Sequence, residues 1–561
     1  MKNRLIIHIL FLILASAIVG ESQSIGTNLP EEKVSLITDR TLYIAGEKIH
    51  IAAFVSNDFN RFEPGQVLYA EIISSTGTSF SKSKLSVLNK EASGCLEIPE
   101  DIVTGVYYVR AYTKYMRNFG PAGYAYIPVK IVNPLSDDVL NGSDNSVFIS
   151  PTQGHSFSDK FEISTDKNEY APRESVNVGI TNLRLSSAAV DRVSKVSISV
   201  IPEFAFSDFT LSLQASDLKS AITYYPETRG VSLTGQLKET VSGKTKPDNR
   251  INLSIIGEGR DYMATQTDTA GRFFFSLPAY TGRRDLFLCT AKDDSTLKQL
   301  LVDNDFCSLP VHLPAAQFNL SSEERATAYR MALNVRIQHQ FDKETLQCPR
   351  PFENDMRAFY GTPSDVIRLD NYVALPTLEE YFNELAGAVN VKKKNGHKYF
   401  KILGTQPEMS YYDPLVLVDY VAISNPDKIL TATPTSIDRI EVIKVPYVKG
   451  DITYGGIVSI ISKKGDFGGI DLPASGIFIN YLFLSDTCRC KISDKTIKDM
   501  PDTRNTLYWN AEFALDDKEK GNFSFSTPDT PGRYVIVVRG VDGKGAEIKQ
   551  DWIFEVKDNK Q

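Results

Sequence analysis

The stretch of sequence that decides the fold occurs twice in the chain. Residues 38–55 read TDRTLYIAGEKIHIAAFV, and residues 165–180 read TDKNEYAPRESVNVGI, at a constant offset of 127 residues. In both copies a polar turn leads to a tyrosine and a tight break, and a run of alternating apolar residues follows. Such period-two alternation is typical of half-buried strands. The repeat therefore predicts at least two related β-domains.

A second unit repeats at an offset of 427 residues. Its first copy contains Gly94, Leu96, Ile98, Gly105 and Tyr107, and the second copy contains Gly521, Phe523, Phe525, Gly532 and Tyr534. A weaker copy begins at Gly271 and has Gly282 as its turn. We interpret each unit as a hairpin, because glycine reaches the positive φ of tight turns at no steric cost. Repeated strand–turn–strand units predict several immunoglobulin-like β-sandwiches.

Two capping-box patterns predict helices. Ser321-x-x-Glu324 and Thr377-x-x-Glu380 each precede apolar residues at helical spacing. With 561 residues, the chain has room for three to five domains. We predict a mainly β chain of tandem sandwiches with an inserted α+β domain. The predicted parts are a signal peptide (1–20), sandwiches at 31–134, 155–229 and 230–313, a helical connector (314–350), the α+β domain (355–466) and a last sandwich (467–561).

The N-terminus predicts export. A short basic region, Met1 to Arg4, precedes an apolar run from Leu5 to about Gly20, with small residues near its end. This is the pattern of a cleaved secretory signal peptide, and the run is shorter than the ~20 apolar residues of a membrane span. After cleavage we expect no transmembrane helix.

Charge and cysteine content narrow the classes of function. The net charge of −7 gives no broad basic field, so we expect no nucleic-acid partner. The six cysteines are scattered, and their pairing cannot be read from the sequence. Cys488 and Cys490 lack the second ligand pair of a zinc site, and the histidines are isolated. We predict no metal, no cofactor and no catalytic residue, and hence no enzyme.

The first predicted sandwich resembles the macroglobulin-type domain of large envelope proteins of Bacteroidota. The resemblance is carried by Thr38-Asp39-Arg40-x-x-Tyr43-x-x-Gly46-Glu47, by residues 67–72, by Gly94 and by residues 105–113. Protease-trapping macroglobulins carry a thioester, typically Cys-Gly-Glu-Gln. The nearest segment here, Gly94-Cys95-Leu96-Glu97, lacks the glutamine. The small sandwich at 230–313 resembles carboxypeptidase-regulatory or transthyretin-like modules through Gly235 and residues 267–273.

The α+β domain resembles the plug domain of TonB-dependent outer-membrane receptors. The matching segments are residues 414–421, residues 437–444 and the glycine-bounded run 454–465. A receptor plug sits inside a barrel of many strands, each ~9–11 residues long. Fewer than a hundred residues follow Gly465, and they read as one sandwich. The resemblance therefore implies a plug-like module without its barrel, and import by this chain alone is not expected.

These features predict a non-catalytic binding or scaffold protein. We expect it in the periplasm or at the outer membrane, with an outer-membrane or periplasmic protein partner in a transport or surface-assembly system. The sequence does not give the oligomeric state. Candidate binding residues are Tyr108, Arg110 and Tyr112 in an aromatic and basic stretch, and Asp419 and Tyr420 after an apolar strand.

Two other functions stay open. The first is a macroglobulin-like endopeptidase inhibitor without a thioester. The second is a hydrolase whose histidine, carboxylate and hydroxyl come together only in the fold.

Overall fold

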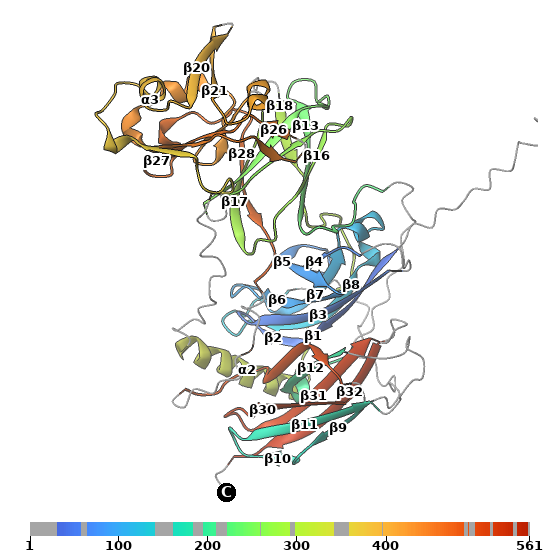
Figure 1. Cartoon of the computed structure of the whole chain (residues 1–561). Coiled ribbons are helices and arrows are strands. Elements are labelled where there is room, and N and C mark those ends of the chain that lie inside the picture. The colour runs from blue at the N-terminus through green and yellow to red at the C-terminus, as the bar shows by residue number, and fades with distance from the viewer. Residues whose placement is uncertain are drawn as a thin grey trace, which may run out of the picture.

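The computed structural model covers most of the chain. It describes residues 31–57, 64–140, 161–182, 195–208, 222–257, 260–291, 298–341, 358–394, 396–450, 452–486, 492, 500–516, 520–541 and 547–558. The predicted signal peptide lies outside these residues. The described part is mainly β, which confirms the predicted fold class (Figure 1). None of its helices combines the length and the apolarity needed to cross a bilayer.

The first sandwich contains eight strands. In the described residues they form one sheet in the order β1-β3-β6-β5-β4-β7-β8-β2, in which β5 pairs with both β6 and β4. Its core is a cluster of fully buried aliphatic residues together with Tyr43 and Tyr107. The strands are β1 (Glu32–Thr38), β2 (Leu42–Ile44), β3 (Lys48–Asn57), β4 (Val67–Ile73), β5 (Ser79–Leu88), β6 (Glu91–Glu97), β7 (Gly105–Thr113) and β8 (Ala125–Val132).

The second sandwich combines strands from two distant parts of the chain. One described sheet has the order β30-β11-β9 and the other the order β10-β32-β31-β12-β29. The prediction of separate sandwiches at 155–229 and 467–561 is therefore wrong: each segment supplies half of one sandwich. Neither half could bury its apolar face alone. The strands are β9 (Phe161–Thr165), β10 (Glu169–Tyr170), β11 (Ser175–Asn182), β12 (Lys195–Pro202), β29 (Tyr508–Ala514), β30 (Lys520–Ser526), β31 (Gly532–Val541) and β32 (Glu547–Val556).

The small sandwich is also completed from outside its predicted range of 230–313. Its described sheets have the orders β16-β13-β18 and β15-β14-β17-β28. Strand β28 pairs with β17 from Arg283↔Leu482 to Leu288↔Ile477. The strands are β13 (Ser232–Glu239), β14 (Arg250–Ile256), β15 (Tyr262–Gln266), β16 (Arg272–Ser276), β17 (Arg283–Thr290), β18 (Lys298–Val302) and β28 (Ile477–Leu482).

The α+β module lies between β18 and β28 in the chain. Its sheet has the order β19-β24-β27-β22-β23, with β22 parallel and β24 antiparallel to β27, so the predicted mixed sheet is confirmed. Strands β22 and β27 are buried throughout, as their continuous apolar runs require. The elements are β19 (Asp365–Arg368), α3 (Leu378–Glu384), β20 (Val389–Lys394), β21 (His397–Ile402), β22 (Leu415–Val418), β23 (Val421–Ala422), α4 (Pro426–Leu430), β24 (Ile437–Ile443), β25 (Tyr447–Lys449), β26 (Ile452–Tyr454) and β27 (Ile457–Ser462).

The modules are thus nested rather than tandem. The α+β module is inserted into the small sandwich, and the small sandwich is inserted into the second sandwich. In space the first sandwich lies in the middle, with the second sandwich on one side of it and the small sandwich and α+β module on the other (Figure 1).

In the units predicted as hairpins, the two strands do not pair with each other. Strand β6 pairs with β3 and β5, whereas β7 pairs with β4 and β8. Likewise β30 and β31 belong to different sheets. The hairpin prediction is wrong because alternation and a glycine turn do not say which strand the returning strand pairs with. The repeated tyrosine closes each connection: Tyr107 donates to the carbonyl of Val103 at 2.7 Å, and Tyr534 donates to that of Thr530 at 2.8 Å. This is the tyrosine corner of immunoglobulin-like folds.

The 127-residue repeat forms the same hydrogen-bond network twice. In the first copy the hydroxyl of Tyr43 donates to Asp39 at 2.8 Å, and the amide of His50 donates to the same carboxylate oxygen at 3.0 Å. In the second copy Tyr170 donates to Asp166 at 2.7 Å, and the amide of Asn177 donates at 3.1 Å. The motif is therefore a local device that ties the turn after the first strand to the third strand.

The two copies differ in what covers them. The second sandwich packs on the first copy, where Thr506 donates to Asp39 at 2.6 Å and Asn505 donates to Glu47 at 2.7 Å. Nearby, Ile37 and Ala52 pack against Ala511. At the corresponding positions the second copy has Ser164 and Gly179, which line an open groove of about 570 Å³.

Helix α2 (Ser322–Phe341) lies beside the junction of the first and second sandwiches. Its capping box is formed as predicted: the amide of Glu324 donates to Ser321 Oγ at 3.1 Å, and the amide of Ser321 donates to Glu324 Oε2 at 2.8 Å. Lys130 of β8 also donates to Glu324, at 2.7 Å. The helix is therefore attached to the first sandwich at its N-terminal end.

The two copies give a matched test of what the Asp39 network contributes. We expect Asp39→Ala to lower the free energy of unfolding by about 3 kcal/mol. The substitution leaves the buried donors of Tyr43, His50 and Thr506 without an acceptor, and it removes one of the carboxylates that pair with Arg40. We expect Asp166→Ala to lower it by about 1 kcal/mol or less, because that copy is solvated. Urea denaturation followed by the fluorescence of Trp509 and Trp552 measures both. Equal effects of the two substitutions would contradict the role of Asp39 at the junction.

Candidate functional site

The predicted aromatic and basic binding residues lie inside the molecule. Tyr108, Arg110 and Tyr112 are fully buried between the first sandwich and the segment that follows β18. Tyr108 donates to the carbonyl of Pro314 at 2.5 Å, and the amide of Cys307 donates to the hydroxyl of Tyr112 at 2.7 Å. These residues therefore bind another part of the same chain. Their proposed role as a free binding surface is corrected, because strand alternation does not reveal that both faces of β7 are covered.

Buried charges fix this junction. Lys84 Nζ lies 2.6 Å from Asp305, and Lys114 Nζ lies 3.5 Å from Asp305 and 3.6 Å from Glu227. Tyr69 donates to Glu227 at 2.8 Å. Because each carboxylate belongs to a segment outside the first sandwich, separating the modules would leave buried lysines without partners. Such a loss is costly, so the junction holds the two modules in one arrangement.

Burial and charge act in opposite directions on the pKa values here. Burial would raise the pKa of the Asp305 carboxyl, but Lys84 and Lys114 outweigh burial and hold it below its ordinary value. Burial also lowers the pKa of the Lys84 ammonium, although Asp305 opposes this change. The pKa of Tyr69 is raised well above its ordinary value by burial and by Glu227. Asp305 is thus ionised at neutral pH.

Asp419 and Tyr420 form the tight turn between β22 and β23. Both have positive φ, 44° and 71°. The Asp419 carboxylate accepts hydrogen bonds from the amide and the hydroxyl of Ser462, at 2.8 and 2.6 Å, and from the amide of Phe467 at 2.8 Å. Asp419 is therefore occupied in holding β27 and the following turn. The Tyr420 ring lies 5.1 Å from the guanidinium of Arg260, so it contacts the small sandwich.

The histidines and Cys95 differ in their surroundings. No group of three or more potential metal ligands occurs among the described residues. His50 is buried near Trp509, and His397 lies 3.3 Å from Asp427 at the surface. Cys95 is disulfide-bonded, so in this state it has no thiol for a thioester.

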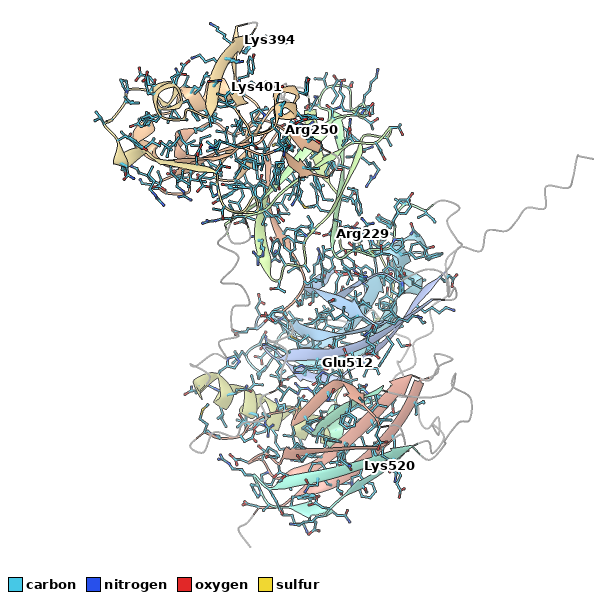
Figure 2. All side chains as sticks on the ribbon, viewed as in Figure 1. Arg229, Arg250, Lys394, Lys401, Glu512 and Lys520 are labelled. Atoms are coloured by element: carbon cyan, nitrogen blue, oxygen red, sulfur yellow. The ribbon has the colours of Figure 1, made fainter. Side chains whose placement is uncertain are left out.

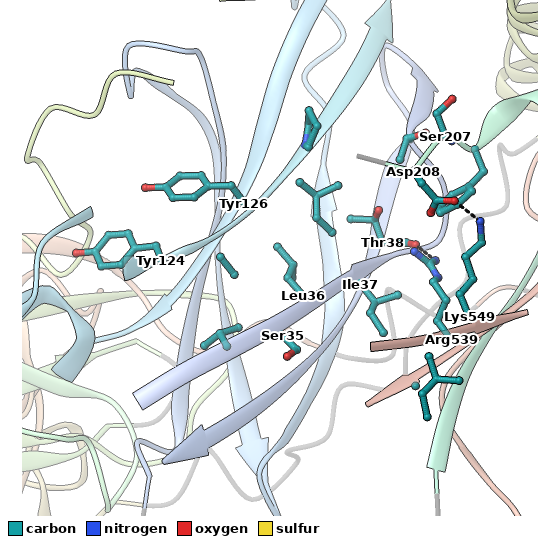
Figure 3. A pocket seen from close by; sticks show the side chains of 18 of the residues that line it. Ser35, Leu36, Ile37, Thr38, Tyr124, Tyr126, Ser207, Asp208, Arg539 and Lys549 are labelled. Carbon is teal, nitrogen blue, oxygen red and sulfur yellow. Dashed lines mark hydrogen bonds and ion pairs between the residues drawn. The ribbon is translucent and has the colours of Figure 1, made fainter. Parts of the chain in front are cut away.

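One cleft of about 310 Å³ opens where the first and second sandwiches meet (Figure 3). Strand β1 forms one wall, and the first half of β8 forms the other. At one end Asp208 accepts a hydrogen bond from Lys549, and Arg539 donates to the carbonyl of Thr38. The lining includes hydroxyl groups and backbone but no histidine.

A patch of exposed apolar side chains lies on the α+β module. We call Leu403, Tyr411, Tyr412 and Val445 the apolar patch; their exposed fractions are 59, 83, 42 and 46%. The three loops that carry them touch one another: the amide of Thr405 donates to the carbonyl of Lys444 at 3.2 Å, and Lys401 Nζ donates to the carbonyl of Tyr412 at 3.0 Å. Figure 2 labels Lys401 on β21, at the end of the molecule opposite to Lys520.

The α+β module is fixed to the small sandwich. Phe287 and Cys289 of β17 belong to the core of the α+β module. The hydroxyls of Tyr262 and Tyr454 are hydrogen-bonded at 2.8 Å, and Lys449 donates to Asp261 at 3.1 Å. Because the two modules share one core, the apolar patch has a fixed position relative to the rest of the chain.

Comparison with known proteins gives a remote likeness only. No family model matches the sequence, and neither does any curated protein. Among solved structures, trypsin-activated alpha-2-macroglobulin from Escherichia coli is 9% identical with a TM-score of 0.23. The aligned region covers 94% of this chain and 41% of the macroglobulin chain. Salmonella alpha-2-macroglobulin reacted with methylamine is 9% identical with a TM-score of 0.24, and covers 94% and 39%. Dimeric latent PorU from Porphyromonas gingivalis is 11% identical with a TM-score of 0.16, and covers 52% and 34%.

The chain thus spans about two fifths of the length of these bacterial macroglobulins, to which it is distantly similar. At such TM-scores the likeness says nothing about activity.

The pH dependence of the free energy of unfolding at acidic pH tests the buried junction. Because the pKa of folded Asp305 lies below its ordinary value, its contribution is complete above about pH 4 and is lost as the pH falls further. At pH 7 we expect Asp305→Asn to lower the free energy of unfolding by roughly 3 kcal/mol. The difference from the parent chain should shrink below about pH 4.

Thermal unfolding across pH 3–7 measures this difference. Asp303→Asn, at a partly exposed neighbour, is the matched control and should have a small effect. A difference for Asp305→Asn that stays constant down to pH 3 would contradict the charge network.

Proposed function

We propose that this chain is a non-catalytic binding and scaffold protein of the bacterial envelope. In this proposal the three sandwiches are a rigid support, and the α+β module docks a protein partner of the periplasm or outer membrane. The observation that carries the proposal is the apolar patch, which is exposed on a module that shares a core with the small sandwich. Exposed apolar patches on otherwise well-packed proteins commonly mark interaction sites.

Three further features support the proposal. The N-terminal sequence has the pattern of a secretory signal peptide, which supports export from the cytoplasm. The buried charges at the junction of the first and small sandwiches favour a fixed arrangement over movement between modules. Tyrosine is enriched in protein interfaces, and the apolar patch contains two.

The inhibitor alternative has less support. The thioester of a covalent trap requires a cysteine that is not in a disulfide, and Cys95 is disulfide-bonded. A non-covalent inhibitor without a thioester would have to form a stable complex with an added endopeptidase, which size-exclusion chromatography would detect.

Site-specific photocrosslinking tests the docking role. A photoreactive phenylalanine replaces Tyr411 in the full-length chain, produced in cells of the source organism. We expect one discrete envelope-protein adduct, because Tyr411 projects from the apolar patch. The same replacement of Tyr329, which is 68% exposed on α2, is the matched control and should not give this adduct.

Substitutions within the apolar patch complete the test. We expect Leu403→Ser with Val445→Ser to reduce the Tyr411 adduct about tenfold, equivalent to about 1.4 kcal/mol of binding energy. The midpoint of unfolding should hardly change, since both side chains are exposed. An undiminished adduct, or the same adduct from Tyr329, would refute docking through the apolar patch.

A further inference from the structure

A two-stranded hairpin with a basic end stands beside the apolar patch. Among the described strands, β20 and β21 pair only with each other, from Val389↔Ile402 to Lys394↔His397. The hairpin projects at one end of the molecule, and Figure 2 labels Lys394 near its tip and Lys401 nearer its base. Because successive side chains of a strand point to opposite sides, the hairpin has two faces with different surroundings.

One face of the hairpin continues the core of the α+β module. Phe400 is buried in that core and packs against Phe382 of α3, with 4.7 Å between the ring centroids. Farther out on the same face, Lys398 forms an ion pair with Glu379 of α3. Lys393 lies opposite Lys398 in the register, so it belongs to this face as well.

The other face of the hairpin leads from the apolar patch to the tip. Lys401 marks its inner end, because its Nζ donates to the carbonyl of Tyr412 at 3.0 Å. Lys392, opposite Tyr399, is the next lysine outward on this face, and Lys394 follows it. Each step between residues on one face of a strand is about 7 Å. We call Lys392 and Lys394 the basic face; it lies about 7 to 14 Å beyond Lys401 along the hairpin.

The positive charge of the hairpin is not neutralised within the described part of the chain. Lys398 and Lys401 have Glu379 and Asp413 as partners. The three lysines at 392–394 are all exposed, and their ammonium groups have no ion pair or hydrogen bond with any described residue. The chain as a whole has a net charge of −7, so this local excess has the opposite sign. Neighbouring like charges on a sheet are destabilising, so folding alone does not account for them.

We propose that the partner which docks on the apolar patch carries an acidic segment that pairs with the basic face. This inference rests on the proposed docking role of the apolar patch. Protein interfaces combine an apolar centre with a polar rim, and complementary charges in the rim steer the partner and fix its register. The basic face is one side of such a rim. It requires one carboxylate for each lysine, spaced about 7 Å apart as Lys392 and Lys394 are.

A protein suits this surface better than an anionic bilayer. Two exposed carboxylates, Glu408 and Asp413, flank the tyrosines of the apolar patch, and Asp413 is 87% exposed. A continuous layer of anionic headgroups would repel both carboxylates. A folded partner can instead place its acidic groups against Lys392 and Lys394 alone.

Edge protection is a role for these lysines that needs no partner. Lysines on an exposed edge strand discourage association with the edges of other sheets. In that role all three lysines at 392–394 would be equivalent, and none would affect docking. The proposed pairing instead separates Lys392 and Lys394 from Lys393, which lies on the other face.

Charge reversal combined with photocrosslinking at Tyr411 tests the pairing in the full-length chain. We expect Lys392→Glu with Lys394→Glu to reduce the Tyr411 adduct about tenfold, and Lys392→Glu alone to reduce it about fivefold, since like charges would then meet across the interface. Lys393→Glu makes the same change of charge on the other face and is the matched control; its effect should be less than about twofold. The midpoint of unfolding should hardly change, because the substituted side chains are exposed.

A zero-length crosslinker tests the acidic character of the partner directly. A carbodiimide joins an amine to a carboxylate that is already in contact with it and leaves no spacer. It is applied to envelopes isolated from the same cells, and mass spectrometry identifies the linked residues. We expect links from Lys392 or Lys394 to aspartate or glutamate of the protein found in the Tyr411 adduct, and no such links from Lys393.

Three results would overturn this inference and leave the docking role intact. They are an adduct undiminished by the double substitution, equal losses for Lys392→Glu and Lys393→Glu, and no carboxylate linked to the basic face. Absence of a discrete Tyr411 adduct from the parent chain would refute the docking role itself, and this inference with it.

Vesicles of phosphatidylethanolamine and phosphatidylglycerol in equal parts test the bilayer as occupant. We expect the purified full-length chain not to sediment with them. Sedimentation that is lost on Lys392→Glu with Lys394→Glu would assign the basic face to a bilayer and would overturn the proposed pairing.

Discussion

The structure depends on the carboxylate of Asp39. This group accepts hydrogen bonds from Tyr43 and the amide of His50 inside the first sandwich, and from Thr506 of the second sandwich. One side chain therefore both shapes a turn and holds a neighbouring module. The counterpart at Asp166 shows that the turn needs only the internal bonds. The contact with Thr506 is what converts a local motif into a junction between modules.

The junction on the other side of the first sandwich uses a different principle. There the lysines belong to the first sandwich and the carboxylates to segments outside it, so neither partner is satisfied alone. Together the two junctions hold the first sandwich between its neighbours (Figure 1). Rigid support and exposed recognition elements are combined in this way in many binding proteins, where a scaffold positions surface groups for a partner.

The sequence predicted local features well and long-range pairing poorly. Alternation around Ile49 and the capping box at Ser321 gave the right elements because both patterns act over a few residues. The pairing of β12 with β29, about three hundred residues apart, leaves no local signal, so one sandwich was interpreted as two. Tyr108, Arg110 and Tyr112 were chosen for their chemistry, yet that chemistry serves an internal junction.

Because the modules are nested, the order in which they can finish folding is restricted. Strands β9 to β12 emerge early, but their partners β29 to β32 come after the small sandwich and the α+β module. Until then, half of the second sandwich exposes apolar faces and unpaired edges, the surfaces from which chains aggregate. The inner modules can close earlier, and contacts of such high sequence separation form slowly. The second sandwich is therefore the last to fold, and it is the part of the molecule that would most need a chaperone.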